Sequence, residues 1–396
     1  MESIGLYIHI PFCRQKCLYC DFPSWAGREG QMQMYVDALT AEIRAQGKRY
    51  ENREVVSVFF GGGTPTALEI PMLAQLMQAI RESFRVTADA ELTTEANPGT
   101  LSYEMAAALK KMGFNRLSMG VQAWQNSILH RLGRIHTIEE FLENYHAVRQ
   151  AGFENVNVDL MFALPGQSMA QWQETVRQIA ALKPEHISAY SLIIEEGTPF
   201  WNRFGEGACA CDYTGPALPD EDTENKIYRF TRKFLQEQGF ERYEISNYAK
   251  PGKECRHNIG YWTEVAYLGL GLGASSYMEG CRFTNEKDLD KYLALDFGEE
   301  DPEKRETALR KLWGQIEELS QAQRMEEFMF LGLRMLKGVS DVDFVRLFGV
   351  KMETVYGDVI RRLTANGLLK KEENNLALTE WGMDVSNFVL SEFLLG

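Results

Sequence analysis

Strand-like and helix-like segments alternate through the first half of this 396-residue chain. Apolar, β-branched runs that suit buried strands occur at residues 6–10, 55–60, 92–96, 117–122, 156–162 and 187–194. Helical patterns lie between them at residues 34–46, 71–84, 103–112, 138–151 and 170–182. This order predicts an α/β fold with parallel strands, a partial (β/α)6 barrel similar to a TIM barrel.

The fifth predicted strand indicates which face carries chemistry. Val156, Val158 and Leu160 alternate with Asn157 and Asp159, and a period of two places the polar pair on one face. Since helices must cover the apolar face, Asn157 and Asp159 are expected to point into the barrel, where burial without partners would be costly. A ligand is therefore expected inside, near the carboxyl ends of the strands.

Three cysteines follow the first predicted strand in the spacing C-x3-C-x2-C. Cys13, Cys17 and Cys20 can converge on one small object from a single loop. Structural zinc takes four ligands, usually from two C-x-x-C pairs, and the sequence has no second pair of that kind. An iron–sulfur cluster held by three thiolates leaves one iron open for another ligand. The missing fourth thiol therefore predicts a reactive cluster.

The cysteine motif, with Tyr19 before its last cysteine, resembles that of the radical S-adenosylmethionine (SAM) superfamily. This resemblance implies a 4Fe-4S cluster on Cys13, Cys17 and Cys20 whose open iron binds SAM. In that superfamily one electron from the cluster cleaves SAM to a 5′-deoxyadenosyl radical, so the cofactors carry the chemistry and the protein positions them.

Further segments, among them YIHIPFC, FFGGGTPT, TEANPG and NVDLMFALPGQ, resemble the oxygen-independent coproporphyrinogen III oxidase group. Glycines let a backbone approach a ligand, and amide and carboxylate groups suit ribose hydroxyls and an ammonium group. For Arg134, a solvated position at a helix end is the alternative to binding a carboxylate. The resemblance implies that SAM, and in part a second SAM, contacts Tyr7, Gly62, Gly63, Thr64, Glu95, Gln122, Arg134 and Asp159.

Two features separate the chain from that oxidase group. Phe22 stands where the oxidase motif carries a fourth cysteine. In addition, only six residues precede Tyr7, where the oxidases carry a longer N-terminal segment that helps to bind substrate. In both features the chain resembles the related branch of haem chaperones, HemW.

A second motif supports the chaperone resemblance. The segment CRHNIGYW carries His257, Asn258, Tyr261 and Trp262 in the H-N-x-x-Y-W pattern of that branch. An imidazole is a common axial ligand of haem iron, and aromatic side chains can cover a porphyrin face. His257 is therefore the expected haem ligand, with a hydrogen-bonded structural histidine as the alternative. Cys255 stays open as a second ligand or attachment point.

Composition and charge limit the setting of the protein. The net charge of −14 disfavours a nucleic-acid partner, because phosphates are neutralised by Lys and Arg. Seven unevenly spaced cysteines fit a reducing compartment. Cys209 and Cys211 form a C-x-C pair, but the sequence near them offers no third metal ligand. The sequence shows no signal-peptide pattern and no apolar run long enough for a membrane span, so a cytoplasmic protein is expected.

The chaperone resemblance also implies partners. These are haem, an electron donor and a haem-acceptor protein, for which a membrane-associated respiratory protein is one option; a homodimer is left open.

A charged segment with a proline, between Asp290 and Arg310, suits a domain boundary. We expect residues 1–290 to form the barrel and an extension with the haem motif, and residues 310–396 to form a small, mostly helical, winged-helix-like domain. From Gln321 onward nine Lys and Arg face eleven Asp and Glu, which disfavours DNA binding. Packing against the barrel, or closing a porphyrin cleft, is the expected role of this domain.

The sequence favours one function and leaves others open. The favoured function is a haem chaperone that binds haem and a 4Fe-4S cluster with SAM and delivers haem to an acceptor protein, without oxidase turnover. The alternatives are an oxygen-independent coproporphyrinogen III oxidase, a radical SAM enzyme that acts on haem, and a structural protein that carries a cluster without binding SAM.

Overall fold

The computed structural model describes residues 3–208, 215–298 and 301–395 of the chain. Cys209 and Cys211 lie outside these ranges. Of the helices that are described, none is both long enough and apolar enough to cross a membrane.

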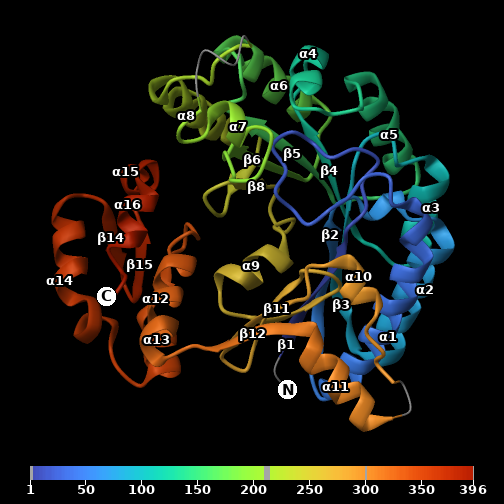
Figure 1. The fold of residues 1–396 in the computed structure, drawn as a ribbon. Helices are drawn as coiled ribbons and strands as arrows, with labels where there is room; N and C mark the ends of the chain where they lie inside the picture. The colour runs from blue at the N-terminus through green and yellow to red at the C-terminus, as the bar shows by residue number, and fades with distance from the viewer. Residues whose placement is uncertain (1–2, 209–214, 299–300, 396) are drawn as a thin grey trace.

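Six parallel strands, neighbours in their sequence order, form the centre of one large sheet (Figure 1). The strands are β1 (Ser3–Ile10), β2 (Glu54–Gly62), β3 (Arg85–Ala96), β4 (Arg116–Gln122), β5 (Val156–Phe162) and β6 (His186–Ser191). The segments between them form η1 (Glu29–Gln31), α1 (Met32–Arg49), η2 (Pro65–Ala67), α2 (Ile70–Ser83), α3 (Tyr103–Lys111), α4 (Asn126–Arg131), α5 (Ile138–Gln150) and α6 (Met169–Ala181). The expected α/β partial barrel is confirmed.

The barrel is open because further strands pair with both of its ends. β1 pairs with β9 and β6 pairs with β8, so that the twelve-stranded sheet has the order β12-β11-β10-β9-β1-β2-β3-β4-β5-β6-β8-β7. These added elements are α7 (Trp201–Phe204), α8 (Glu221–Glu237), β7 (Glu241–Arg242), β8 (Asn247–Ala249), α9 (Arg256–Trp262), β9 (Ala266–Leu270), β10 (Ser275–Met278), β11 (Cys281–Asn285), α10 (Leu289–Leu293), α11 (Pro302–Leu312) and β12 (Trp313–Glu318).

Helix starts follow local capping chemistry. Thr137 caps α5 by accepting from the backbone N–H of Glu140, whose side chain accepts from the backbone of Thr137 in return. Ser168 and Gln171 form the same capping box at the start of α6. Such boxes satisfy backbone donors that the first helical turn leaves free, so they favour the start of each helix at this position.

Among the strands whose limits differ from those expected, β3 and β6 are the most informative. β3 begins at Arg85 rather than at Leu92, because its first half, RVTADAE, mixes charged and apolar residues and gives only a weak strand signal. β6 ends at Ser191, and Leu192 and Ile194 instead pack in a small core around Phe200. Both differences reflect contacts that lie outside the local sequence pattern.

A smaller domain follows the large sheet and forms a separate lobe in Figure 1. Its elements are α12 (Gln321–Gly332), β13 (Val339–Ser340), α13 (Asp341–Phe348), α14 (Met352–Ala365), β14 (Leu369–Glu372), β15 (Asn375–Leu378), α15 (Glu380–Asp384) and α16 (Ser386–Ser391). The three strands pair in the order β13-β15-β14. Helix, strand, two helices and a two-stranded wing is the order of a winged-helix domain, as the sequence predicted.

The boundary between the two domains lies later in the chain than residues 290–310. β12 pairs with β11 in the large sheet, and Leu309, Leu312 and Trp313 lie in the core of that sheet. Met325 belongs to the separate core of the smaller domain. We therefore propose a boundary just after β12 instead of the division into residues 1–290 and 310–396.

The carboxylate of Glu42, on α1, joins the barrel to its extension. It accepts hydrogen bonds from the Tyr292 hydroxyl at 2.6 Å, from the Gly271 N–H at 3.0 Å and from the Asn285 amide at 3.0 Å. These partners come from α10, the β9–β10 turn and β11, so one buried group ties distant segments together. The three hydrogen bonds lower the pKa of Glu42, but burial of the carboxyl group has the larger effect and raises this pKa to about 7.

The raised pKa of Glu42 predicts a pH-dependent stability. Between the ordinary value of 4.5 and about 7 the folded protein binds this proton more tightly than the unfolded chain, so the free energy of unfolding falls as pH rises through that window. The shift corresponds to a loss of at most about 3 kcal/mol. We expect denaturant unfolding from pH 5 to 8 to show this decline in the wild type, and Glu42→Gln to be less stable at pH 5 with a flatter profile. Parallel profiles would contradict the assignment.

Candidate cluster and SAM site

The carboxyl ends of β1 to β5 surround one cavity, which we call the cysteine cavity. All of the expected cluster and SAM residues except Tyr7 line it, together with side chains that the sequence did not single out. The lining residues from the expected set are Cys13, Cys17, Cys20, Gly62, Gly63, Thr64, Glu95, Gln122, Arg134 and Asp159. Parallel strands bring their carboxyl ends to the same edge, which explains why residues far apart in sequence meet here.

The loop with the three cysteines is held against the end of β2. The Gly63 N–H donates to Ile10 O and the Thr64 N–H donates to Phe12 O, each at 2.8 Å. The Thr64 hydroxyl reaches the Cys13 sulfur at 3.6 Å. Glycine is required at position 63 because an added Cβ would lie 2.7 Å from Phe12 O and 3.0 Å from the Cys13 sulfur.

The three cysteines are free thiols in the described structure. Burial raises the pKa of Cys13, and it raises the pKa of Cys20 to about 11, so that metal binding would have to displace their protons. Within the described ranges, no cluster of three or more His, Cys, Asp or Glu side chains is arranged to hold a single metal ion. Three thiols spaced around a cavity are compatible with a 4Fe-4S cluster, in which each thiolate binds a different iron.

Arg134 is bound to protein groups rather than solvated at a helix end. Its Nη2 donates to Asn97 Oδ1 at 2.8 Å and also to the Gly120 carbonyl. Another nitrogen, Nη1, donates to the Cys17 sulfur at 3.5 Å. In the described part of the chain Arg134 Nε is buried without a partner, which leaves a donor for a ligand in this cavity.

Two half-buried carboxyl groups, which we call the floor of the cavity, line it from β3 and β5. Asp159 accepts from the Ser118 hydroxyl at 2.9 Å and from the Asn157 amide at 2.7 Å, and burial raises its pKa. Burial and then the neighbouring Asp159 raise the pKa of Glu95 to about 8, although the Gly62 N–H donates to it. A cationic ligand such as an ammonium group would favour the ionised carboxylates, so the floor suits a positively charged ligand.

Sequence reasoning missed three side chains that form hydrogen bonds with the expected residues of this cavity. Asn97 joins Arg134 to the Thr64 hydroxyl, to which its amide donates at 2.7 Å. The Tyr190 hydroxyl donates to Gln122 Oε1 at 3.2 Å, and Ser118 binds Asp159. Asn97 directly follows β3 in the motif TEANPG, and Ser118 lies within β4 in the motif RLSMGVQ, so these two motifs were the available signal.

Tyr7 lies beside the cysteine cavity but does not line it. A Cβ added at Gly61 would meet the Tyr7 ring at 3.1 Å and Glu95 Oε2 at 3.2 Å, so these two side chains flank the same glycine. The Tyr7 hydroxyl is 3.1 Å from His9 Nδ1 and faces a second cavity. Contact between Tyr7 and SAM stays a prediction.

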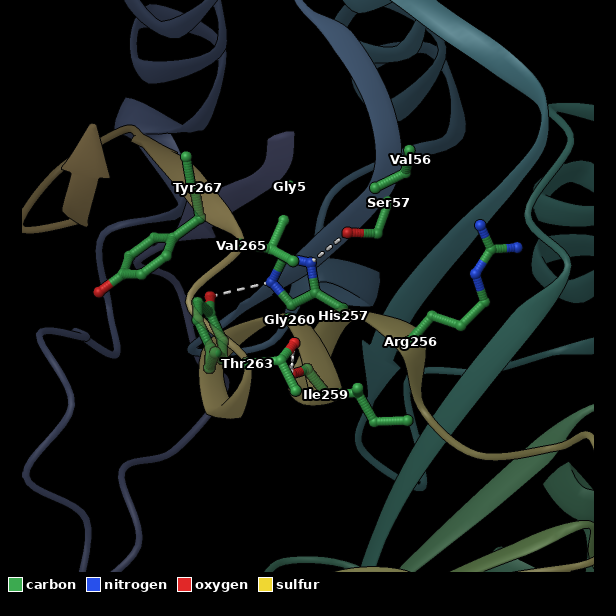
Figure 2. Close-up of a pocket in the computed structure, with 12 residues that line it drawn as sticks. Gly5, Val56, Ser57, Arg256, His257, Ile259, Gly260, Thr263, Val265 and Tyr267 are labelled. Atoms are coloured by element: carbon green, nitrogen blue, oxygen red, sulfur yellow. Dashed lines mark hydrogen bonds between the residues drawn. The ribbon is translucent and has the colours of Figure 1, made fainter. Parts of the chain in front are cut away.

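His257 is buried beside Gly5 of β1 and Ser57 of β2 (Figure 2), and it does not line the cysteine cavity. Its Nδ1 is 2.9 Å from the Ser57 hydroxyl and its Nε2 is 2.9 Å from the Tyr261 hydroxyl. The ring also stacks on Phe59, and burial lowers its pKa to about 3. Binding of haem iron by His257 stays a prediction, and it would require one of the two hydrogen bonds to break.

The neighbours of His257 in the haem motif, Cys255, Asn258 and Trp262, each contact different parts of the protein. Asn258 is half-buried on α9. The Trp262 ring packs under the Arg334 guanidinium at 4.3 Å, and among the described residues its indole N–H is buried without a partner. Cys255 is buried beside Glu91, and burial raises its pKa to about 12, which does not favour a role as a thiolate ligand.

Comparison with known proteins gives matches over nearly the whole chain. Residues 7–179 match the Radical SAM superfamily, and residues 319–385 match the HemN C-terminal domain. The chain is 36% identical to the haem chaperone HemW of Lactococcus lactis over 98% of this chain and 97% of the relative. It is 35% identical to the haem chaperone HemW of Bacillus subtilis, over 98% of each chain.

Among solved structures, the fold is similar to that of coproporphyrinogen III oxidase (HemN) from Escherichia coli. The TM-score is 0.84, with 23% identity, over 100% of this chain and 90% of the oxidase chain.

Gly63→Ala tests the close approach of β2 to the cysteine loop. Because the added Cβ would meet two backbone oxygens and the Cys13 sulfur at 3.0 Å or less, the loop must shift, at a cost of about 1–3 kcal/mol. We expect less iron and sulfide per chain after anaerobic reconstitution, with a weaker visible absorbance of the cluster. Gly30→Ala is the matched control, since no heavy atom lies within 4 Å of its added Cβ. Equal iron contents in the two variants would contradict the geometry.

Proposed function

The chain belongs to the haem chaperone HemW family of the radical SAM superfamily, and from this membership we propose that it binds haem and a 4Fe-4S cluster with SAM and passes haem to an acceptor protein. The observation that carries the proposal is the similarity to haem chaperones over 98% of the chain. Phe22, in place of the fourth cysteine of the oxidase motif, favours the chaperone over the oxidase.

The residues of the cysteine cavity supply what a cluster and SAM would need. Cys13, Cys17 and Cys20 would hold the cluster, which supplies an iron with an open position for SAM when bound. Glu95 and Asp159 offer carboxylates to the positive charge of SAM. The glycines at the end of β2 allow the backbone to approach the ligand closely.

The proposal implies further partners and a location. The cluster needs an electron donor, and haem needs an acceptor protein; a respiratory protein at the membrane would suit this role, and the proposal leaves a homodimer open. The free cysteines of the described structure support a reducing compartment, so we place the protein in the cytoplasm.

The proposal predicts haem binding without porphyrin turnover. We expect the reconstituted protein to take up haem stoichiometrically, followed by the Soret absorbance, and to form no protoporphyrinogen from coproporphyrinogen III with SAM and reductant. Catalytic formation of protoporphyrinogen, detected by chromatography, would identify an oxidase. Consumption of the bound haem with SAM would identify an enzyme that acts on haem.

A Cys17→Ser variant separates the two binding functions. The sulfur of Cys17 lies in the cysteine cavity beside Arg134, so its replacement should lower cluster content and SAM binding. Haem uptake should persist, because the haem motif on α9 lies outside this cavity. Loss of haem uptake in a folded variant would show that the cluster itself is required for haem binding.

A further inference from the structure

A cavity of about 390 Å³ lies next to the cysteine cavity and is lined largely by aromatic rings; we call it the aromatic cavity. Small-molecule sites typically enclose about 300–1,000 Å³, so this size suits a ligand. The rings come from β1, the cysteine loop, α9 and β9, and α12 of the smaller domain adds an apolar wall. The side chains that matter here are Tyr7, Phe22, Tyr261, Trp262, Tyr267 and Leu331.

Most groups in the aromatic cavity that could bind a metal ion already have partners. His9 Nε2 is 2.8 Å from the Pro23 carbonyl, and His9 Nδ1 is 3.1 Å from the Tyr7 hydroxyl. The Tyr261 hydroxyl is paired with His257 Nε2 at 2.9 Å. Each of these groups would have to give up a hydrogen bond before it could bind iron.

Tyr267 differs because its hydroxyl oxygen receives a hydrogen bond from a cation. Arg282 Nη1 donates to it at 3.1 Å, and no described residue accepts the hydroxyl proton. A tyrosine oxygen is one of the axial ligands that haem iron accepts. Figure 2 shows the Tyr267 side chain pointing away from His257.

Arg282 is held in a defined orientation. Its Nε and Nη2 each donate at 2.8 Å to the carboxylate of Glu327 on α12, which leaves Nη1 for Tyr267. Bidentate pairing of this kind fixes the plane of the guanidinium group. The donor to the Tyr267 oxygen is therefore in place before a ligand enters.

We infer that the aromatic cavity is the haem site and that the Tyr267 oxygen binds the haem iron. The identity of the ligand rests on the proposed function. Iron(III) forms a bond to the phenolate oxygen, the phenol proton passes to solvent, and the water molecule at the axial position of the iron leaves; the iron stays iron(III). The surrounding rings cover the porphyrin face.

The test is a titration of the reconstituted full-length protein with ferric haem, read by the Soret absorbance, electron paramagnetic resonance and the resonance Raman modes of an iron-bound phenolate. We expect those modes in the wild type. Tyr267→Phe keeps the ring but lacks the oxygen, so we expect it to lose the phenolate modes and to bind haem about tenfold more weakly.

Tyr277→Phe is the matched control. The Tyr277 ring packs against the same guanidinium at 5.2 Å but does not line the aromatic cavity, so this variant should keep the phenolate modes. An unchanged spectrum in Tyr267→Phe, or a loss of haem signals only in His257→Gln, would overturn the assignment of Tyr267 while the proposed function stands. Failure of the wild type to take up haem would overturn both.

Discussion

Two short backbone hydrogen bonds between the end of β2 and the cysteine loop define the candidate site. Because Gly63 donates to Ile10 O and Thr64 donates to Phe12 O, the loop after β1 is laid against the turn after β2. The contact leaves no room for a side chain at position 63 and places the Cys13 thiol beside the Thr64 hydroxyl. The other cysteines and the strand ends with Glu95 and Asp159 then close around the same space.

Sequence patterns were sufficient where the determining interactions are local. Alternation in β5 correctly predicted that Asp159 points into the barrel, where it lines the cysteine cavity, and the helical pattern correctly located α5. The same patterns did not predict the limits of elements that are determined by packing between segments far apart in the sequence. The extension of the sheet through β12 depends on Trp313 entering a core built by distant strands, and no local pattern reveals this contact.

The haem motif illustrates the same limit at the level of single residues. Its sequence offers an imidazole next to two aromatic residues, but folding places the imidazole of His257 between Ser57 and Tyr261. Tyr261 and Trp262 instead face the aromatic cavity, which Tyr7 also lines. Because Phe22 lines both this cavity and the cysteine cavity, haem in the aromatic cavity would lie beside the proposed SAM site.

The smaller domain contributes directly to the aromatic cavity. Leu331 of α12 forms part of its wall, and Glu327 of the same helix holds the guanidinium that donates to Tyr267. Because a bidentate pair fixes the guanidinium plane, the direction of that donor depends on the position of α12. If haem occupies this cavity as proposed, two features of its site, the Leu331 wall and the orientation of the Arg282 guanidinium beside Tyr267, both depend on the position of α12.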